Sequence, residues 1–257
     1  MSGYVHGYSG REAERLADQA AILEALIHDG LSFPPGTHVL EAGCGTGRQT
    51  AALLARHPGI RITALDIDAG QLAAARAACP GPRVTWIHGD LRTAPLADAG
   101  FDHGFVCFVL EHLADPAAAL GVLRRAVRPG GRVTVVEGDH GSFRTVPETA
   151  AGRAAWDALV AAQRRLGGNP DIGRRLHGLL TAAGFSDVRV EPRTVFADAG
   201  APALRDGFTR RIIVPMVAGA VDGAAHAQGL ADLAAASSGP DGVTTYTFYR
   251  AVGRVPE

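Results

Sequence analysis

The sequence contains no lysine, so arginine supplies all 25 of its strongly basic side chains. Against 26 acidic residues, these arginines leave a formal net charge of −1. A chain so close to neutrality has no general electrostatic attraction for nucleic acid or for an anionic membrane. We therefore expect a small molecule as its partner, and neither nucleic acid nor a membrane.

Cysteine is also scarce. The chain has three cysteines, an odd number, with no CxxC pair: Cys44, Cys79 and Cys107. Disulfide frameworks and structural zinc sites need paired, closely spaced cysteines, so this pattern favours a reducing cytoplasm. No HExxH motif or grouped histidine and carboxylate pattern is present, so we expect no required metal.

Long apolar runs are missing as well. The longest apolar stretch, residues 212–221, is too short to span a bilayer and contains Pro215. The first six residues lack the basic and apolar regions of a signal peptide. Hydrophobic residues make up 47% and charged residues 20% of the 257 residues, as in ordinary globular proteins. We predict one cytoplasmic domain over residues 1–257.

Short β-rich runs alternate with helical periodicity along most of the chain. This alternation indicates a parallel, doubly wound α/β sheet. Strands are expected at residues 38–41, 61–65, 84–87, 101–109, 132–137, 188–195 and 244–250. Helices are expected at residues 11–29, 47–57, 69–78, 116–127, 147–167 and 171–183.

The strongest local signal is the stretch Val39-Leu-Glu-Ala-Gly-Cys-Gly-Thr-Gly47, in which a strand runs into a glycine-rich turn and then a helix. Glycines allow a tight turn and a close approach of the backbone to a ligand, because no Cβ intervenes. The spacing is GxGxG, and Arg48 stands where a dinucleotide-binding turn would have its third glycine. This departure argues against a dinucleotide-dependent oxidoreductase.

The same stretch resembles motif I of the class I S-adenosylmethionine (SAM)-dependent methyltransferases. In that family these glycines pass beneath the amino-acid part of SAM, and an acid ends the preceding strand. The resemblance implies SAM as cofactor, S-adenosylhomocysteine as its product, and cofactor-binding positions at Glu41, Gly43, Cys44 and Gly45.

Further matches follow in the family's order. A carboxylate at the end of the second strand can accept hydrogen bonds from both ribose hydroxyls. This role fits Asp66 better than Asp68. The alternative is that each is an ordinary solvated acid in a loop. Asp90 and Leu91 fall where the family recognises adenine. Residues 101–102, 109–113 and 128–132 also match the family's pattern. The cofactor-binding positions that we predict in these later segments are Asp66, Ile67, Asp90, Leu91 and Cys107.

The expected fold is therefore a class I methyltransferase Rossmann-like domain, with a seven-stranded, mostly parallel sheet, helices on both faces and helical lid insertions. Residues 31–137 would form the SAM-binding core. Residues 1–30 would form an N-terminal lid segment and helix, and residues 138–170 and 198–238 would cover the substrate. The alternative is that these segments are ordinary peripheral helices.

Two clusters are candidates for the chemistry. Residues 137–142 place Asp139 beside His140 at the carboxyl edge of the sheet, where an acid could orient an imidazole base. Tyr4 and Tyr8 could stack on an aromatic substrate and hydrogen-bond to it, with His6 a weaker candidate. A polar loop and an unstructured terminus are the alternatives. His112 could face the cofactor, whereas Arg174, Arg175, His177 and Arg193 are expected to be structural or on the surface.

The acceptor is the least determined part of the prediction. The (N/D)PP(Y/F) tetrapeptide of nucleic-acid amino methyltransferases is absent, and residues 110–113 resemble the ubiquinone/menaquinone-type enzymes. A narrower resemblance, to bacterial indole C3-methyltransferases of natural-product pathways, implies methylation of a tryptophan-derived cyclic dipeptide with pyrroloindoline formation. The alternatives are O- or N-methylation of another small metabolite, and SAM binding without catalysis. A homodimer is possible.

Overall fold

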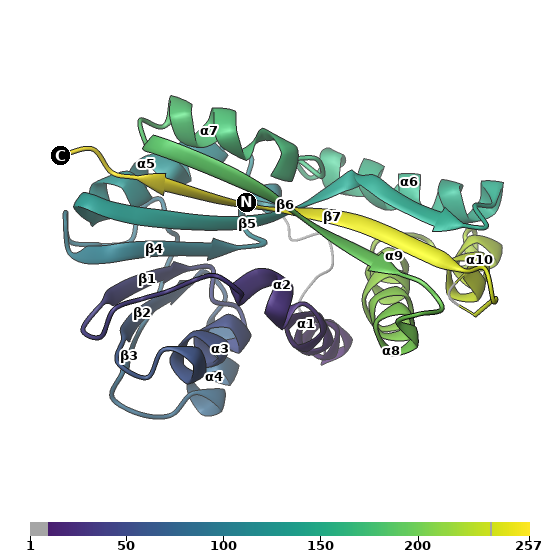
Figure 1. The fold of residues 1–257 in the computed structure, drawn as a ribbon, viewed down its shortest axis with the longest axis horizontal. Coiled ribbons are helices and arrows are strands. Elements are labelled where there is room, and N and C mark those ends of the chain that lie inside the picture. Colours follow the sequence, from purple (N-terminus) through teal and green to yellow (C-terminus); the bar gives the residue numbers. More distant parts are fainter. Residues whose placement is uncertain (1–9, 237) are drawn as a thin grey trace.

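The structure, a computed structural model, describes residues 10–236 and 238–257. A single seven-stranded sheet runs through the molecule in the order β3-β2-β1-β4-β5-β7-β6 (Figure 1). Only β7 runs antiparallel to its neighbours. The predicted seven-stranded, mostly parallel sheet is thus confirmed. The strands are β1 (His38–Ala42), β2 (Arg61–Asp66), β3 (Val84–His88), β4 (Phe101–Cys107), β5 (Val127–Val146), β6 (Ser186–Ala197) and β7 (Val243–Arg254).

Helices cover both faces of the sheet, and side-chain alternation along the strands explains how. Successive residues of a strand point to opposite faces. In β1, Val39 joins the apolar cluster on the side of α3 and α4, whereas Leu40 joins the cluster on the side of α5 and α7. The helices are α1 (Gly10–Ile22), α2 (Glu24–His28), α3 (Arg48–Arg56), α4 (Ala69–Ala78), α5 (Pro116–Ala126), α6 (Ala150–Arg165), α7 (Leu176–Ala182), α8 (Pro202–Asp206), α9 (Val214–Ala220) and α10 (Ala227–Ala236).

The fifth strand is much longer than its sequence indicates. We expected it to end at residue 137, with Asp139 and His140 at the carboxyl edge of the sheet and a polar loop as the alternative, but β5 continues to Val146. The physical reason is its partner: β7 pairs with β5 from Arg132 to Val146, with a register shift between Asp139 and Arg144. Asp139 and His140 therefore lie within the sheet and not in a loop.

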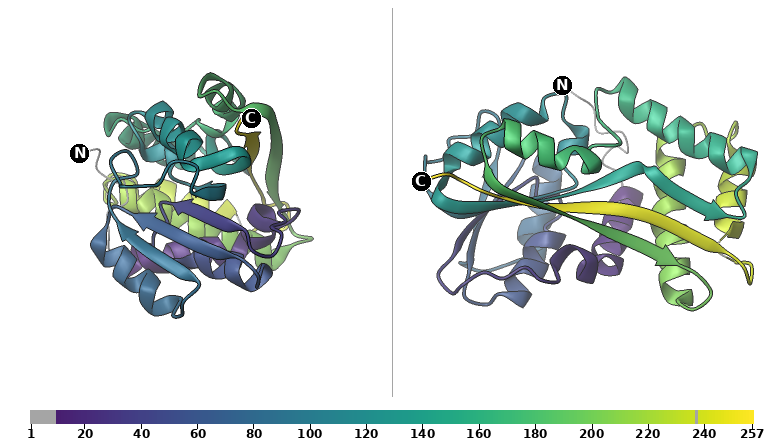
Figure 2. Two further views of the ribbon diagram at one scale, coloured as in Figure 1. Left: turned by 90° about the vertical axis from the view of Figure 1, so that its left-hand side faces the viewer. Right: turned by 45° about the horizontal axis from the view of Figure 1, so that its top comes forward.

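The described parts of the expected covering segments lie toward the end of the molecule where β5, β6 and β7 extend beyond the parallel part of the sheet, with α1 between that end and α3 (Figures 1 and 2). There α1 packs against a π-helical turn at Gly207–Ile213, and α6 packs against α9 and α10. Two expected helices are also interrupted: the one at 11–29 breaks between α1 and α2, and that at 171–183 begins as a 3-10 turn at Gly173–Arg175 before α7.

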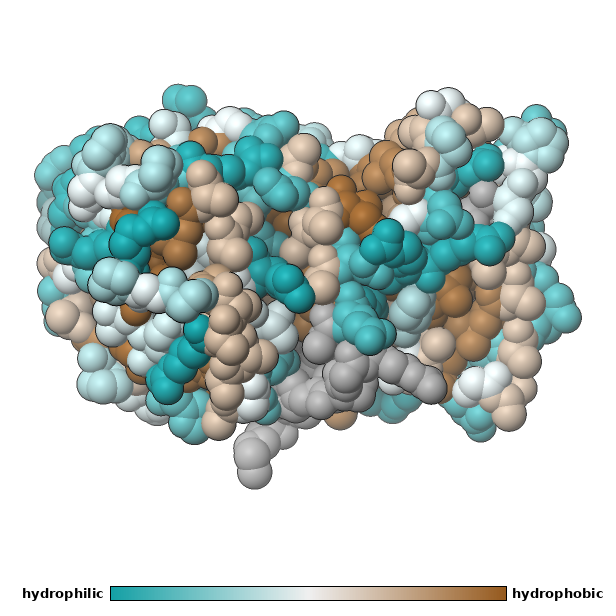
Figure 3. Space-filling model, turned by 90° about the horizontal axis from the view of Figure 1, so that it is seen from below, coloured by the Kyte–Doolittle hydropathy of each residue, from teal (hydrophilic) through white to brown (hydrophobic). Residues whose placement is uncertain are grey.

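On the face that carries α1, α3 and α4, polar and apolar side chains are mixed, and hydrophobic groups show most clearly toward the end where α8–α10 lie (Figure 3). Among the described residues, no helix combines the length and the apolar character needed to cross a membrane.

Candidate functional site

The glycine-rich turn between β1 and α3 forms the floor of a cavity at the carboxyl ends of the strands. Gly43, Gly45 and Gly47 all have positive φ, at 76°, 53° and 77°, a region that side-chain-bearing residues rarely adopt. A Cβ on Gly43 would lie 2.4 Å from Cγ2 of Val109. The Gly43 N–H also donates to the Leu65 carbonyl of β2 over 2.8 Å. Glycine is therefore required here both by the backbone conformation and by the close packing.

Glu41 supports this turn from below and does not line the cavity. Its side chain is buried, and the hydroxyl of Thr50 in α3 donates to its Oε2 over 2.6 Å. Burial raises the pKa of Glu41 to about 8, and the negative charge of Asp66 adds to the rise. The contact with Thr50 ties β1 to the beginning of α3, so Glu41 holds the cradle in shape.

Asp66, at the end of β2, lines the cavity. One carboxylate oxygen accepts the Gly45 N–H over 2.7 Å, and the other accepts the Asp68 N–H over 2.9 Å. Burial raises the pKa of Asp66, while these backbone hydrogen bonds oppose the rise. Asp68 has a different task, because its side chain caps α4 by accepting the Gln71 N–H over 2.8 Å. The structure therefore separates the two acids into one at the cavity and one at a helix end.

At the far end of the cavity, Asp90 is already engaged by an arginine. The Arg92 guanidinium donates to both carboxylate oxygens of Asp90, at 2.9 Å from Nε and 2.5 Å from Nη2. These contacts hold the pKa of Asp90 below its usual value. Leu91 lines the same end. An adenine amine bound here would share the Asp90 oxygens with Arg92, which the sequence did not indicate.

The cavity has a volume of about 240 Å³ and lies outside the carboxyl ends of β1, β2 and β4, where open α/β sheets bind their ligands. Ile67 and Cys107 also lie on its wall, as expected, and Leu16, Gln19 and Ala20 of α1 close one side. Burial raises the pKa of the Cys107 thiol. Of the predicted cofactor-binding residues, the lining contains Gly43, Cys44, Gly45, Asp66, Ile67, Asp90, Leu91 and Cys107.

An inner recess of about 30 Å³ adjoins this cavity, and Gln19 and Phe108 line both. Phe108 has a positive φ of 57°, a strained conformation for a phenylalanine. The recess is mostly apolar, and its polar side chains come from Gln19, Glu111, His140 and Tyr246. The described residues that line it are Gln19, Phe108, Glu111, Gly138, His140, Phe208, Ile212, Ile213, Met216, Tyr246 and Phe248.

His140 is the predicted base that reaches the recess. Its Nδ1 lies 2.8 Å from the Tyr246 hydroxyl, and its carbonyl accepts the Trp156 indole N–H over 3.0 Å. Nε2 has no hydrogen-bond partner within residues 10–236 and 238–257. Burial lowers the pKa of His140, so the imidazole is neutral near pH 7. A neutral ring fixed on one side and free on the other can take part in a proton transfer.

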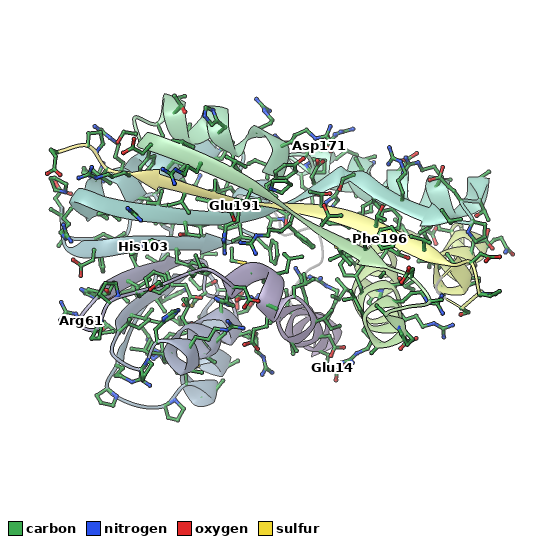
Figure 4. All side chains as sticks on the ribbon, viewed as in Figure 1. Glu14, Arg61, His103, Asp171, Glu191 and Phe196 are labelled. Atoms are coloured by element: carbon green, nitrogen blue, oxygen red, sulfur yellow. The ribbon has the colours of Figure 1, made fainter. Side chains whose placement is uncertain are left out.

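Asp139 lies on the opposite face of the strand from His140, because neighbouring strand residues point apart. It forms a two-pronged ion pair with Arg174, at 2.6 and 2.9 Å, and is only 2% exposed. Nearby Asp171, labelled above the sheet in Figure 4, accepts the Gly141 N–H over 3.0 Å. Asp139 therefore does not orient the His140 ring; its observed partner is Arg174, which is structural as expected.

The remaining N-terminal candidates, Tyr4, His6 and Tyr8, lie outside the described residues. His112 lines the cofactor cavity, and its Nε2 lies 3.5 Å from Oε1 of Glu111. No cluster of three or more histidine, cysteine or acidic side chains placed to hold a metal ion occurs within the described part of the chain.

Sequence reasoning missed several residues that shape the site. Glu137 is fully buried, and its Oε1 accepts the Val109 and Leu110 N–H groups over 3.0 and 2.7 Å, which fixes the segment that contacts Gly43. Burial and the negative charge of Glu111 raise its pKa. An acid within the apolar run Val133-Thr-Val-Val-Glu137 is the one sequence signal that could have revealed it. Tyr246 comes from the last strand and had no such signal.

The cavity residues fit SAM. The glycine turn leaves space that side chains would fill, and Asp66 presents carboxylate oxygens at the end of β2. Gln71 adds a buried Oε1 on the cavity wall that has no hydrogen-bond partner among the described residues. A cradle with unfilled acceptor capacity suits a ligand that carries ribose hydroxyls and an ammonium group.

Comparisons with known proteins agree with this fit. Residues 40–135 match the family model described as a methyltransferase domain. One related protein, from Streptomyces fradiae, is described as an uncharacterised 37.1 kDa protein in transposon TN4556. It is 34% identical to this chain over 85% of this chain and 64% of its own length. The ubiquinone/menaquinone biosynthesis C-methyltransferase of Paracoccus denitrificans is 32% identical over 53% of this chain and 59% of its own length. The chain thus spans less than two thirds of these relatives.

Solved structures agree on the fold. A phosphoethanolamine N-methyltransferase of Haemonchus contortus, in complex with phosphomonomethylethanolamine and S-adenosylhomocysteine, superposes with a TM-score of 0.60 at 16% identity. The match covers 92% of this chain and 53% of that one. The fold of this chain is that of the class I methyltransferases, and the comparisons support SAM as the cofactor.

Proposed function

We propose that this chain, whose family match, relatives and fold support a class I SAM-dependent methyltransferase, transfers a methyl group to a small-molecule acceptor. Our best candidate for the acceptor atom is C3 of the indole in a tryptophan-derived cyclic dipeptide or a similar metabolite. The observation that carries the proposal is the junction of two spaces: a glycine-floored cavity for the cofactor and a recess with aromatic walls, which share Gln19 and Phe108.

Bound SAM would supply a methyl group activated by its sulfonium charge. The chain's own residues would bind and orient the reactants. The backbone of the glycine turn would face the amino-acid part, and Asp66 would accept the ribose hydroxyls. Leu91 would pack on the adenine, whose amine would lie by Asp90. Positioning of this kind contributes roughly 7–11 kcal/mol in favourable reactions.

For an indole acceptor, C3 would bond to the methyl carbon as the carbon–sulfur bond of the sulfonium breaks, which leaves neutral S-adenosylhomocysteine and turns the indole ring into an iminium ion. An internal amide nitrogen then closes onto C2, which forms the pyrroloindoline, and releases one proton. Nε2 of the neutral His140 would accept that proton. Tyr246 would hold the ring through Nδ1, and the proton would leave to solvent after product release.

The N-terminal residues and the insertions would cover the acceptor. Helix α1 and the turn at Gly207–Ile213 pack together beside the recess, which supports this role. Truncation of residues 1–9, which removes Tyr4 and Tyr8, should cut turnover at least tenfold and leave SAM affinity unchanged. Unchanged turnover would refute the covering role. Homodimeric assembly and a cytoplasmic location remain predictions from the sequence.

A second candidate is O- or N-methylation of another small metabolite. Relatives named as O-methyltransferases favour it, one of them 31% identical over 53% of this chain. Incubation with methyl-deuterated SAM and a panel of tryptophan cyclic dipeptides, simple indoles, quinols and phenols, followed by mass spectrometry and NMR, decides between the two. A label at indole C3 supports our best candidate. A label on quinol or phenol oxygen overturns it in favour of the second, and SAM binding with no labelled product supports a non-catalytic binder.

A further inference from the structure

The inner recess combines a carboxylate with aromatic faces and has no basic counter-charge of its own. Its lining contains Glu111 but neither arginine nor lysine in the part of the chain that the structure describes. His140 is neutral near pH 7, because burial lowers its pKa. Among the described residues the ion-pair partner of Glu111 is His112 on the cofactor side, whose Nε2 lies 3.5 Å from Oε1. A negative charge is therefore present in the recess without a permanent cation.

One backbone and one side-chain hydrogen bond hold Glu111 in this position. Its carbonyl accepts the Asn169 N–H over 2.8 Å, and its Oε2 accepts a hydrogen bond from the side-chain Nε2 of Gln163 over 3.3 Å. A Cβ on Gly168 would come within 2.6 Å of the Glu111 carbonyl, so the two segments are closely packed. With 8% of its surface exposed, Glu111 is fixed but still reaches the recess. A buried carboxylate whose ion-pair partner is a histidine, and not an arginine or lysine, costs folding free energy while that histidine is neutral, which makes its presence informative.

The apolar walls of the recess are also suited to positive charge. Phe248 is the common neighbour of three rings, with centroid distances of 4.6 Å to Tyr246, 5.4 Å to Phe108 and 6.3 Å to Phe208. The faces of aromatic rings attract cations, and the attraction grows when water is excluded. A carboxylate next to such rings makes a site that prefers a flat cationic group to a neutral one.

We propose that Glu111 and these aromatic rings stabilise the positive charge that methyl transfer moves onto the acceptor, and so select electron-rich nitrogen heterocycles. This inference rests on the proposed function. The sulfonium loses its charge as the methyl group leaves, and an indole that gains the methyl at C3 carries that charge on N1 and C2. A phenolate would instead become neutral, and it would enter the recess against the charge of Glu111. The acceptor class is thus neutral before the reaction and cationic after it.

Binding of a charged mimic tests the inference without turnover. The probe is the 1,2,3,3-tetramethyl-3H-indolium cation, compared at pH 7 with neutral 1,2,3,3-tetramethylindoline, by calorimetry on protein saturated with S-adenosylhomocysteine. The cation should bind at least about tenfold more tightly to the wild type. In Glu111→Gln this preference should fall to about threefold or less. The matched control Glu148→Gln, which makes the same change at an exposed position, should keep the full preference.

Equal affinities of the two probes for the wild type, or a preference that survives in Glu111→Gln, would overturn the inference. Glu111→Asp keeps the negative charge. If Glu111→Gln loses the cation preference because it lacks this charge, and not because it is misfolded, Glu111→Asp should retain most of the preference. The outcome is separable from that of the proposed function. A cation preference lost in Glu111→Gln supports the recess assignment even if the acceptor panel yields no methylated indole, whereas a methylated indole without such a preference overturns this inference alone.

Discussion

Replacement of Gly43 by alanine should destabilise the fold and the cofactor site together. Two costs add at this position. A φ of 76° costs a residue with a Cβ about 1–2 kcal/mol. The new methyl would also lie 2.4 Å from Cγ2 and 3.2 Å from Cγ1 of Val109, and overpacking of this kind costs about 1–3 kcal/mol. We expect a loss of about 2–5 kcal/mol in the free energy of unfolding, measured by urea denaturation, and weaker SAM binding by calorimetry.

Gly36→Ala is the matched control. Gly36 has a φ of 88°, but its added Cβ would meet nothing within 4 Å, so only the backbone cost of about 1–2 kcal/mol applies. The double variant Gly43→Ala with Val109→Ala should recover part of the loss, because it removes the methyl groups that clash. Equal losses in Gly43→Ala and Gly36→Ala, or strict additivity in the double variant, would show that the contact with Val109 is unimportant.

Three further predictions concern buried or cavity carboxylates. Because burial raises the pKa of Glu41 from 4.5 to about 8, the folded state keeps a proton that the unfolded state releases, so wild-type stability should fall as the pH rises through this window. Glu41→Gln should not show that decrease, so between pH 4.5 and 8 its free energy of unfolding, measured by urea titration, should rise by roughly 3–5 kcal/mol relative to that of the wild type. If the stability of both proteins changed with pH in the same way, the assignment to Glu41 would be wrong. Asp66→Asn should weaken SAM binding about 10–100-fold by calorimetry with little change in melting temperature, and unaltered affinity would remove Asp66 from the ribose site. Arg174→Gln leaves Asp139 buried without its cation, so the free energy of unfolding measured by urea denaturation should fall by about 2–3 kcal/mol while SAM affinity stays constant. Surface substitutions usually change stability by less than about 0.5 kcal/mol, so a loss below that value would show that the ion pair is not structural.

The cofactor half of the site could be predicted because its signals are local. The turn from Gly43 to Gly47 and the acid at Asp66 each follow directly from a strand, and the end of a parallel strand is where such sheets bind ligands. The seven strands and their mostly parallel arrangement follow from the same local alternation. The structure differs in element bounds and continuity: β5 is longer than expected, and the helix expected at 11–29 divides in two.

The acceptor half could not be predicted in the same way, because its geometry depends on partners distant in sequence. The length of β5 is set by pairing with β7, about a hundred residues later in the chain. The same pairing places Tyr246 beside His140 and leaves Asp139 to Arg174. Nothing near residues 137–142 in the sequence specifies Arg174 or Tyr246 as a partner. Asp139 and His140 were therefore interpreted as one pair, although their side chains lie on opposite faces of β5.

The separation of the two halves along the chain has a consequence for how this protein can diversify. Among the described residues, those that line the cofactor cavity all lie between Leu16 and Leu113, whereas most of the recess lining comes from the turn and helix around 208–216 and from β7. Substitutions in those later segments can reshape the acceptor space while the cofactor cradle keeps its sequence. The same order holds during synthesis, since chains fold from the N-terminus as they emerge. A ribosome must add more than half of the chain after Leu113 before Phe248 completes the recess.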